Sequence, residues 1–318
     1  MADPTVLLTG AGGQIGTELT TALRDRYGTG NVIATDVEDP DGALGEPFER
    51  VDVTDRGQLE TVIEEYDPDV VYHLAAILSA VGEKKPHLAY DVNVNGLYNA
   101  LEVSREADVD QLIVPSSISV FGPETPSNPG EVTILQPTTL YGISKVFGEL
   151  LGEYYYDRYD LDVRGVRFPG ILSHKTLPGG GTTDYAVEVF YEALQEGEYT
   201  YFVREDTMLP MMYMPDAVKA LIELSEADGS NLRHRANYNV GSLAFTPEEL
   251  TAEIRTHLPD FEASYEPDER QEIADSWPDT IDDSAAREDW GWEPEYGFER
   301  MVEDMIENLS ERELPQLS

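Results

Sequence analysis

Two residues four positions apart, Tyr141 and Lys145, are the pair in this sequence best suited to proton transfer. Residues at positions i and i+4 share one face of a helix, so the lysine ammonium would lie near the phenol. A nearby positive charge favours the phenolate and lowers the pKa of a tyrosine from about 10. The spacing predicts that Tyr141 is a general base, if a helix carries the pair. The alternative is a packed tyrosine beside a solvated lysine.

The surroundings of the pair favour the chemical interpretation. The chain has only five lysines, and Lys145 follows two adjacent serines, Ser116 and Ser117, which come just after an apolar run. We therefore predict that Tyr141, Lys145, Ser117 and Ser116 act together.

A glycine segment near the N-terminus has the features of a dinucleotide site. Gly10, Gly13 and Gly16 lie between an apolar run at residues 5–8 and a helical pattern at 17–27. Without side chains, a diphosphate can approach the backbone N–H groups at the start of the helix. Asp36 ends the next apolar run, where an acid accepts hydrogen bonds from an adenosine ribose and repels a 2′-phosphate. The segment predicts NAD in preference to NADP.

The elements that must position these residues alternate between strand and helix. An α/β fold follows, with a Rossmann-type doubly wound parallel sheet and a smaller α/β substrate lobe. The expected strands lie at 5–8, 31–36, 70–74, 111–114 and 161–168, and the expected helices at 17–27, 57–66, 90–107 and 142–159.

The pattern loosens after about residue 172, where a Gly/Pro-rich loop at 177–181 precedes a helical pattern at 185–195. We expect an NAD-binding domain made of residues 1–172 with 208–243. The substrate-binding lobe would comprise residues 173–207 with 244–318. No linker of low complexity separates them, so the two parts should pack together.

The charge of the chain excludes some classes of function. Lys+Arg 21 stand against Asp+Glu 63, a net charge of −42, which would repel nucleic acids and anionic lipid surfaces. Acids are spread throughout, and such a polyanion repels itself in dilute buffer, whereas molar salt shortens the Debye length to about 3 Å. We predict a salt-adapted surface and a salt-loving source organism; the alternative is an ordinary acidic protein.

Other composition features limit the chemistry. The chain has no cysteine, which excludes disulfides, thiolate nucleophiles and cysteine-based zinc sites. Its five histidines show no paired helical spacing, so we expect no metal site. No segment reaches the ~18 apolar residues of a membrane span, and the start lacks the pattern of a signal peptide. We expect a soluble cytoplasmic protein.

Several motifs together resemble the extended short-chain dehydrogenase/reductase family: the glycine segment, residues 73–76 (HLAA), 93–96 (NVNG), the two serines and the Tyr/Lys pair. The resemblance implies that Tyr141 is the catalytic base and that Lys145 holds the nicotinamide ribose and lowers the tyrosine pKa. It also implies that Ser117 or Ser116 binds the reacting oxygen. It implies cofactor contacts at Gly10, Gly13, Gln14, Ile15, Gly16, Asp36, Asp52, Val53, Leu74, Ala75, Ala76, Asn93, Tyr141, Lys145, Pro169 and Ile171.

Within that family, four further segments resemble the short-chain type of NAD-dependent L-threonine 3-dehydrogenases: residues 76–83, 178–187, 209–214 and 273–278. The resemblance implies oxidation of the C3 hydroxyl of L-threonine to 2-amino-3-ketobutyrate. It implies substrate contacts at Ser79, Ser116, Tyr141, Thr183 and Trp277. Thr182 is an alternative to Thr183, both threonines could belong to a helix cap, and Trp277 could pack between the lobes.

Two other functions share this cofactor half. A nucleotide-sugar epimerase or dehydratase of the same family would need basic residues for a second diphosphate, and Arg164, Arg167 and Arg204 are the nearby candidates. A non-catalytic NAD-binding regulator would have a damaged Ser/Tyr/Lys set. The resemblance also implies a homodimer paired through the helices at 90–107 and 142–159, although the tyrosines at 154–156 could be core.

Overall fold

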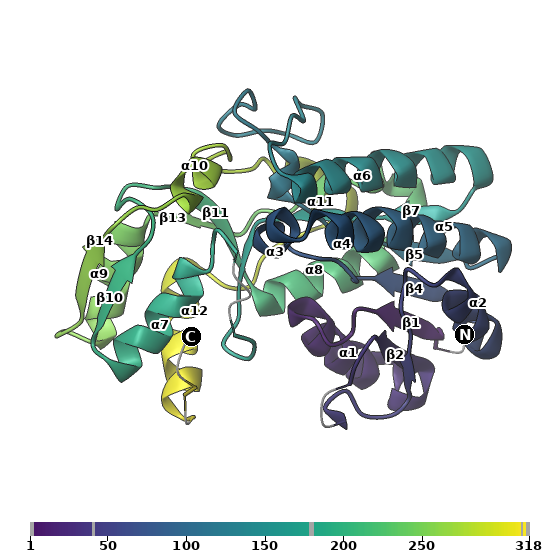
Figure 1. Ribbon diagram of the computed structural model, residues 1–318, viewed down its shortest axis with the longest axis horizontal. Helices are drawn as coiled ribbons and strands as arrows, with labels where there is room; N and C mark the ends of the chain where they lie inside the picture. The colour runs from purple at the N-terminus through teal and green to yellow at the C-terminus, as the bar shows by residue number, and fades with distance from the viewer. Residues whose placement is uncertain (1–2, 40–41, 178–180, 313, 316–318) are drawn as a thin grey trace.

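The computed structural model of the chain describes residues 3–39, 42–177, 181–312 and 314–315 (Figure 1). Its centre is a six-stranded sheet in the order β3-β2-β1-β4-β5-β7, with every neighbouring pair parallel. The sheet consists of β1 (Val6–Thr9), β2 (Val32–Asp36), β3 (Phe48–Arg50), β4 (Val70–His73), β5 (Gln111–Ile113) and β7 (Asp162–Arg164). Strand order reverses between β1 and β4, which is where ligands bind in open parallel sheets.

Helices cover both faces of this sheet, because alternate side chains of each strand point to opposite faces. Leu8 of β1 packs in a core with α1 (Gln14–Tyr27) and α8 (Met214–Glu226). Leu7 packs in a second core with α2 (Arg56–Tyr66), α5 (Leu97–Glu106) and α6 (Leu140–Tyr159). The doubly wound α/β fold is confirmed.

Two expected elements are divided in the structure. The strand expected at 161–168 separates at Gly165 into β7 and β8 (Val166–Phe168), and β8 joins a second sheet with β6 (Ser116–Ser117) and β12 (Tyr238–Asn239). A side chain at Gly165 would overlap the Val114 carbonyl oxygen. The helix expected at 90–107 is α4 (Pro86–Tyr90), a π-helical turn (Asp91–Gly96) and α5.

The remaining elements build a third core, which belongs to the smaller lobe. It contains residues of α7 (Tyr185–Gln195), α9 (Pro247–His257), α10 (Arg270–Ala274), α12 (Phe298–Ser310), β10 (Glu198–Tyr201) and β11 (Leu209–Tyr213). β10 pairs with β14 (Glu262–Tyr265), and β11 lies between β9 (Gly170–Leu172) and β13 (Leu243–Phe245). Figure 1 shows this lobe beside the large sheet.

The cores do not follow the expected boundaries in two places. Trp292 and the alanines of α11 (Ser284–Trp290) lie in the core with α1 and α8, although they belong to the segment 244–318. Leu209, Met211 and Tyr213 lie in the core of the second lobe, although they belong to 208–243. These segments cross between the parts, and the division into two lobes stays a proposal.

Candidate active site

The glycine segment between β1 and α1 is shaped by close backbone contacts. Gly10 has φ +72, and a Cβ atom there would lie 2.6 Å from the backbone nitrogen of Ala75. A Cβ atom at Gly16 would overlap the Gly10 carbonyl oxygen. Helix α1 begins at Gln14, and Gly13 at its N-cap provides no side-chain cap. The N–H groups at this helix start are therefore suited to a diphosphate.

Asp36 lies at the end of β2 with its carboxylate against the glycine segment. One oxygen accepts a hydrogen bond from Gly12 N at 2.9 Å, and the other accepts from Val37 N at 2.7 Å. Each carboxylate oxygen has a further lone pair for a ribose hydroxyl. The fixed negative charge would repel a 2′-phosphate at this place. The contacts and the charge of the Asp36 carboxylate therefore fit NAD, and this observation does not depend on residue spacing in the sequence.

The start of α6 carries Tyr141 into position. Thr139 is the N-cap and accepts a hydrogen bond from Gly142 N at 3.1 Å. Leu140 N, one of the unpaired N–H groups of the first turn, donates to the Glu83 carboxylate at 2.7 Å. A Cβ atom at Gly142 would overlap the Ser119 carbonyl oxygen, so only glycine allows α6 to approach this loop. The Ser117 side chain lies close enough to the Tyr141 phenol to lower its pKa.

Lys145 lies one turn further along α6. Its Nζ donates to the Pro115 carbonyl oxygen at 2.8 Å and lies 5.4 Å from the centroid of the Tyr141 ring. Burial lowers the pKa of Lys145 to about 8, although the charge of Glu149 opposes this shift. Burial raises the pKa of Tyr141 to about 12, although the nearby Ser117 hydroxyl opposes this shift. This is the pKa in the chain by itself, and its lowering by Lys145 together with a positive nicotinamide ring stays a prediction.

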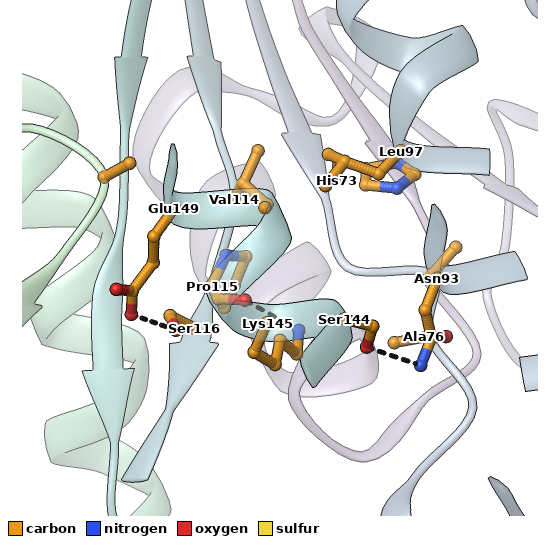
Figure 2. A pocket seen from close by; sticks show the side chains of 13 residues that line it. His73, Ala76, Asn93, Leu97, Val114, Pro115, Ser116, Ser144, Lys145 and Glu149 are labelled. Carbon is orange, nitrogen blue, oxygen red and sulfur yellow. Dashed lines mark hydrogen bonds between the residues drawn. The ribbon is translucent and has the colours of Figure 1, made fainter. Parts of the chain in front are cut away.

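Ser117 and Ser116 have different partners. Ser117 is partly exposed, and its hydroxyl accepts from Ser119 N at 3.2 Å and lies near the Tyr141 phenol. Ser116 is buried, and its hydroxyl donates to the Glu149 carboxylate at 2.6 Å (Figure 2). Ser117 is therefore placed to contact an alcohol beside Tyr141. The Ser116 hydroxyl is hydrogen-bonded to Glu149 in this structure, and its contact with the substrate stays a prediction.

Glu149 and Arg167 form a buried network that sequence reasoning missed. Arg167 donates from Nε and Nη2 to the two oxygens of Glu149, at 2.8 and 2.7 Å. Arg167 also donates to the Glu131 carbonyl oxygen at 3.0 Å. The sequence contained one signal for this network: Glu149 lies four residues after Lys145 and so on the same face of the helix.

Asn93, expected as a cofactor contact, has its side chain committed to the protein. It accepts from Ile77 N at 2.7 Å and donates to Ile77 O at 3.0 Å and to Ser144 Oγ at 3.3 Å. Asn93 thus ties the segment after β4 to α6 (Figure 2). The π-helical turn places it there, and spacing rules for a regular helix would not have found this role.

The segment held by Asn93 contains several expected contacts. Leu74, Ala75 and Ala76 are partly exposed after β4, and Leu74 N donates to Thr9 O at 3.0 Å. Ser79 begins α3 (Ser79–Lys84), which packs against α6. The structure therefore brings Ser79 and the glycine segment to the same edge of the sheet as Tyr141.

The second lobe contributes Thr183 and Trp277. Thr183 is partly exposed, and a Cβ atom at Gly170 would lie 2.8 Å from its methyl group, so Thr183 lies against β9 between Pro169 and Ile171. Thr182 is buried. Trp277 packs against both the second-lobe core and the cluster of Ile118, Val120 and Phe121, as an interlobe residue does. Residues 178–180 of the glycine loop lie outside the described residues.

Asp52 and Val53, the expected adenine contacts, are held within the fold. Asp52 accepts from Thr54 N at 2.9 Å and from Thr54 Oγ1 at 2.7 Å. The Val53 side chain is buried, and a Cβ atom at Gly96 would lie 2.8 Å from it. Their adenine contacts stay predictions.

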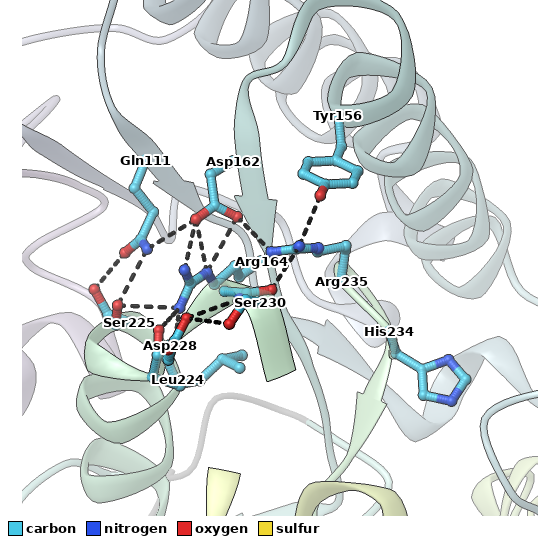
Figure 3. A network of polar contacts seen from close by, with 12 residues as sticks. Gln111, Tyr156, Asp162, Arg164, Leu224, Ser225, Asp228, Ser230, His234 and Arg235 are labelled. Atoms are coloured by element: carbon cyan, nitrogen blue, oxygen red, sulfur yellow. Dashed lines mark hydrogen bonds and ion pairs between the residues drawn. The ribbon is translucent and has the colours of Figure 1, made fainter. Parts of the chain in front are cut away.

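The three arginines considered for a second diphosphate all have protein partners. Arg164 is buried and donates to Asp162 and to carbonyl oxygens at the end of α8 (Figure 3). Arg167 is bound to Glu149, and Arg204 is bound to Asp275 at 2.6 Å. The neighbouring Arg235 donates to Asp162 and to the Tyr156 hydroxyl. A sugar diphosphate would have to displace one of these pairs.

Two further observations concern the described ranges of the chain. No group of three or more His, Cys, Asp or Glu side chains there is arranged to hold a metal ion. None of the helices in that part of the chain is both long and apolar enough to cross a bilayer.

Comparison with known proteins gives one family. The description NAD dependent epimerase/dehydratase family matches residues 6–241. An uncharacterized epimerase/dehydratase from Staphylococcus saprophyticus is 47% identical over 313 residues, covering 97% of this chain and 98% of that protein.

Among solved structures, an L-threonine dehydrogenase from Clostridium difficile is 45% identical with TM-score 0.95, covering 98% of this chain and 99% of that one. A holo L-threonine dehydrogenase from Cupriavidus necator is 50% identical with TM-score 0.94, covering 96% and 100%. A monomeric L-threonine 3-dehydrogenase from a metagenome is 47% identical with TM-score 0.92, covering 96% and 99%. Because the family match runs from β1 to just past β12 and so includes every strand that borders the glycine segment, the chain belongs to the NAD-dependent epimerase/dehydratase family, whose cofactor is NAD.

Proposed function

We propose that this enzyme oxidises the C3 hydroxyl of L-threonine to 2-amino-3-ketobutyrate with NAD. The observation that carries the proposal is the arrangement of Tyr141 beside Ser117, with the Lys145 ammonium 5.4 Å from the centroid of the Tyr141 ring. This arrangement suits removal of a proton from an alcohol. The similarity to solved L-threonine dehydrogenases supports the choice of alcohol.

In the proposed reaction Tyr141 as phenolate takes the proton of the C3 hydroxyl. The Ser117 hydroxyl holds the same oxygen while it becomes a carbonyl. The hydrogen at C3 leaves as hydride, for which NAD supplies the acceptor when bound. Lys145 and the positive nicotinamide offset the burial that raises the pKa of Tyr141. Much of the acceleration would come from holding the alcohol beside its base.

The proposed substrate contacts come from three parts of the chain. Ser79 lies on the segment fixed by Asn93, and Thr183 lies against Gly170. Of the adjacent threonines, we choose Thr183 because Thr182 is buried. Trp277 would close the site from the second lobe.

One assay tests the function. Purified protein in high salt is given NAD and L-threonine, and NADH formation is followed by absorbance. We expect turnover with L-threonine and none with a panel of nucleotide sugars. Turnover of a nucleotide sugar alone would favour the epimerase or dehydratase alternative, and no turnover with either would favour a regulator. The engaged arginines argue against the epimerase or dehydratase, and the complete Tyr/Ser/Lys set argues against the regulator.

We also propose a homodimer, on an apolar surface that α4, α5 and α6 share. Tyr90, Tyr98, Ile143, Phe147, Leu150 and Tyr154 are exposed on these helices, which pack side by side (Figure 1). The exposed fraction of Leu150 is 66%. Clustered exposed apolar side chains are typical of protein interfaces. One similar protein is described as monomeric, so the assembly needs measurement.

A further inference from the structure

His73 has a buried nitrogen that the catalytic arrangement does not use. It is the last residue of β4, and its side chain is buried. Its Nδ1 shares a hydrogen bond with Thr9 Oγ1 at 2.8 Å. Its Nε2 has no hydrogen-bond partner among the described residues. Buried polar atoms are nearly always satisfied, by protein or by ordered water.

His73 is one of the residues that line a small cavity. His73 and Lys145 line it together with Asn93, Ser144 and Glu149 (Figure 2). Its volume is about 20 Å³, and a single buried water needs roughly 10–15 Å³ and two or more polar partners. Leu97 of α5, Gly148 of α6 and Ala236, which precedes β12, also line it. The cavity therefore has room for one water, and His73 and Lys145 are polar side chains among the residues that line it.

Lys145 can supply the second partner. An ammonium has three donors, and one of them binds the Pro115 carbonyl oxygen. Burial and the charge of Lys145 hold the pKa of His73 at about 3. The imidazole is therefore neutral at physiological pH and can accept a hydrogen bond at Nε2, with Nδ1–H donating to Thr9.

We propose that one buried water bridges Lys145 Nζ and His73 Nε2, accepting from the ammonium and donating to the imidazole. His73 is then a positioning residue for Lys145. The charged and titratable groups facing the ammonium are Tyr141 and Glu149 from α6, His73 from β4, and Arg167 from β8, which is paired with Glu149.

The consequence concerns the charge beside Tyr141. A water that accepts from Lys145 and is itself polarised by a neutral imidazole stabilises the ammonium. Without it, Lys145 loses its proton at lower pH, and Tyr141 ionises at higher pH. The pH range in which the enzyme is active should therefore become narrower at both its acidic and its alkaline limit.

The first test is structural and independent of the substrate. A high-resolution crystal structure of the holoenzyme should contain a water within hydrogen-bond distance of both nitrogens. The His73→Phe variant, which removes the acceptor and keeps a ring, should lack this water. Absence of the water from the wild-type structure overturns the proposal.

The second test is kinetic and rests on the proposed function. In His73→Phe, the acidic limb of the kcat/KM profile with L-threonine should move up by about one pH unit, and the alkaline limb should move down by a similar amount. His73→Gln retains an acceptor and should recover part of both shifts. Tyr72→Phe, on the opposite face of β4, is the control and should leave both limbs unchanged.

The outcomes separate the two proposals. If wild-type protein contains the water but does not oxidise L-threonine, the proposed function fails and the water site stands. If L-threonine is oxidised and His73→Phe has wild-type limbs, His73 does not position Lys145, and the inference is overturned. A purely structural role for His73 would lower stability without moving either limb.

Discussion

Arg167 binds both oxygens of Glu149 through a pair of hydrogen bonds at 2.8 and 2.7 Å, and both side chains are buried. A buried pair that loses one partner leaves an uncompensated charge. We expect Arg167→Met to destabilise the protein by about 3–5 kcal/mol in urea unfolding. The double variant Arg167→Met with Glu149→Gln should recover most of this loss, because the amide is neutral and still accepts from Ser116. If the free energy of unfolding of Arg167→Met lies within about 1 kcal/mol of the wild-type value, the buried pair does not have this role.

Tyr141→Phe tests the general base. We expect kcat with L-threonine to fall by about 10²–10⁴, while the affinity for NAD measured by calorimetry stays near that of wild type. Tyr159→Phe, on the same helix, is the matched control. Near-normal turnover of Tyr141→Phe would exclude this base.

The pH dependence of the reaction follows from the same residue. Burial raises the pKa of Tyr141 to about 12 in the chain by itself, so catalysis needs positive charge to bring ionisation to lower pH. The rate should rise with pH as the phenol loses its proton. Lys145→Met removes one of these charges and should move that rise to higher pH, measured as kcat/KM. A rise that stays in place would show that Lys145 does not act on the phenol.

Asp36 should determine the choice of dinucleotide. In Asp36→Ser the ribose loses a charged acceptor, so KM for NAD should increase by about 10- to 100-fold. The loss of negative charge should also raise kcat/KM with NADP relative to NAD. Glu38→Gln, an exposed neighbour, serves as the control. An unchanged ratio in Asp36→Ser would mean that this carboxylate does not contact the ribose.

The surface shared by α4, α5 and α6 should hold the dimer together. Leu150→Glu places a charge in an apolar contact and should convert a dimer to a monomer at micromolar concentration, measured by light scattering after gel filtration. Val132→Glu, at a side chain that is 90% exposed elsewhere, should leave the mass unchanged. If the wild-type protein is a monomer in the same measurement, the proposed homodimer is wrong.

Salt should stabilise this polyanion. With a net charge of −42, the midpoint of thermal unfolding should rise between ~0.1 M and ~2 M KCl as repulsion is screened. Sucrose in place of the salt controls for exclusion of solutes from the surface. Maximum stability at low salt contradicts the salt adaptation.

Local sequence patterns predicted the parts of the fold that depend on local rules. The glycine segment, the apolar strand runs and the helix containing Tyr141 and Lys145 all follow from periodicity and turn chemistry. The break at Gly165 depends on the carbonyl oxygen of Val114, and the place of Trp292 depends on packing against α8. Such contacts between distant segments leave no local pattern.

The site shows the same limit. Ser116 and Ser117 look alike in sequence, and only the fold gives Glu149 to one and Tyr141 to the other. The pKa of Tyr141 required knowledge of burial, because spacing alone reports the nearby charge and omits desolvation. The role of Asn93 depended on a π-helical turn.

Gly142 has a consequence for engineering the substrate range. The α6 backbone meets the Ser119 carbonyl oxygen there without room for a side chain, so library diversity at that position would be lost as misfolded protein before any activity is screened. Randomisation is better directed to the proposed substrate contacts Ser79, Thr183 and Trp277, where a new side chain should change which alcohol fits without altering the position of the helix.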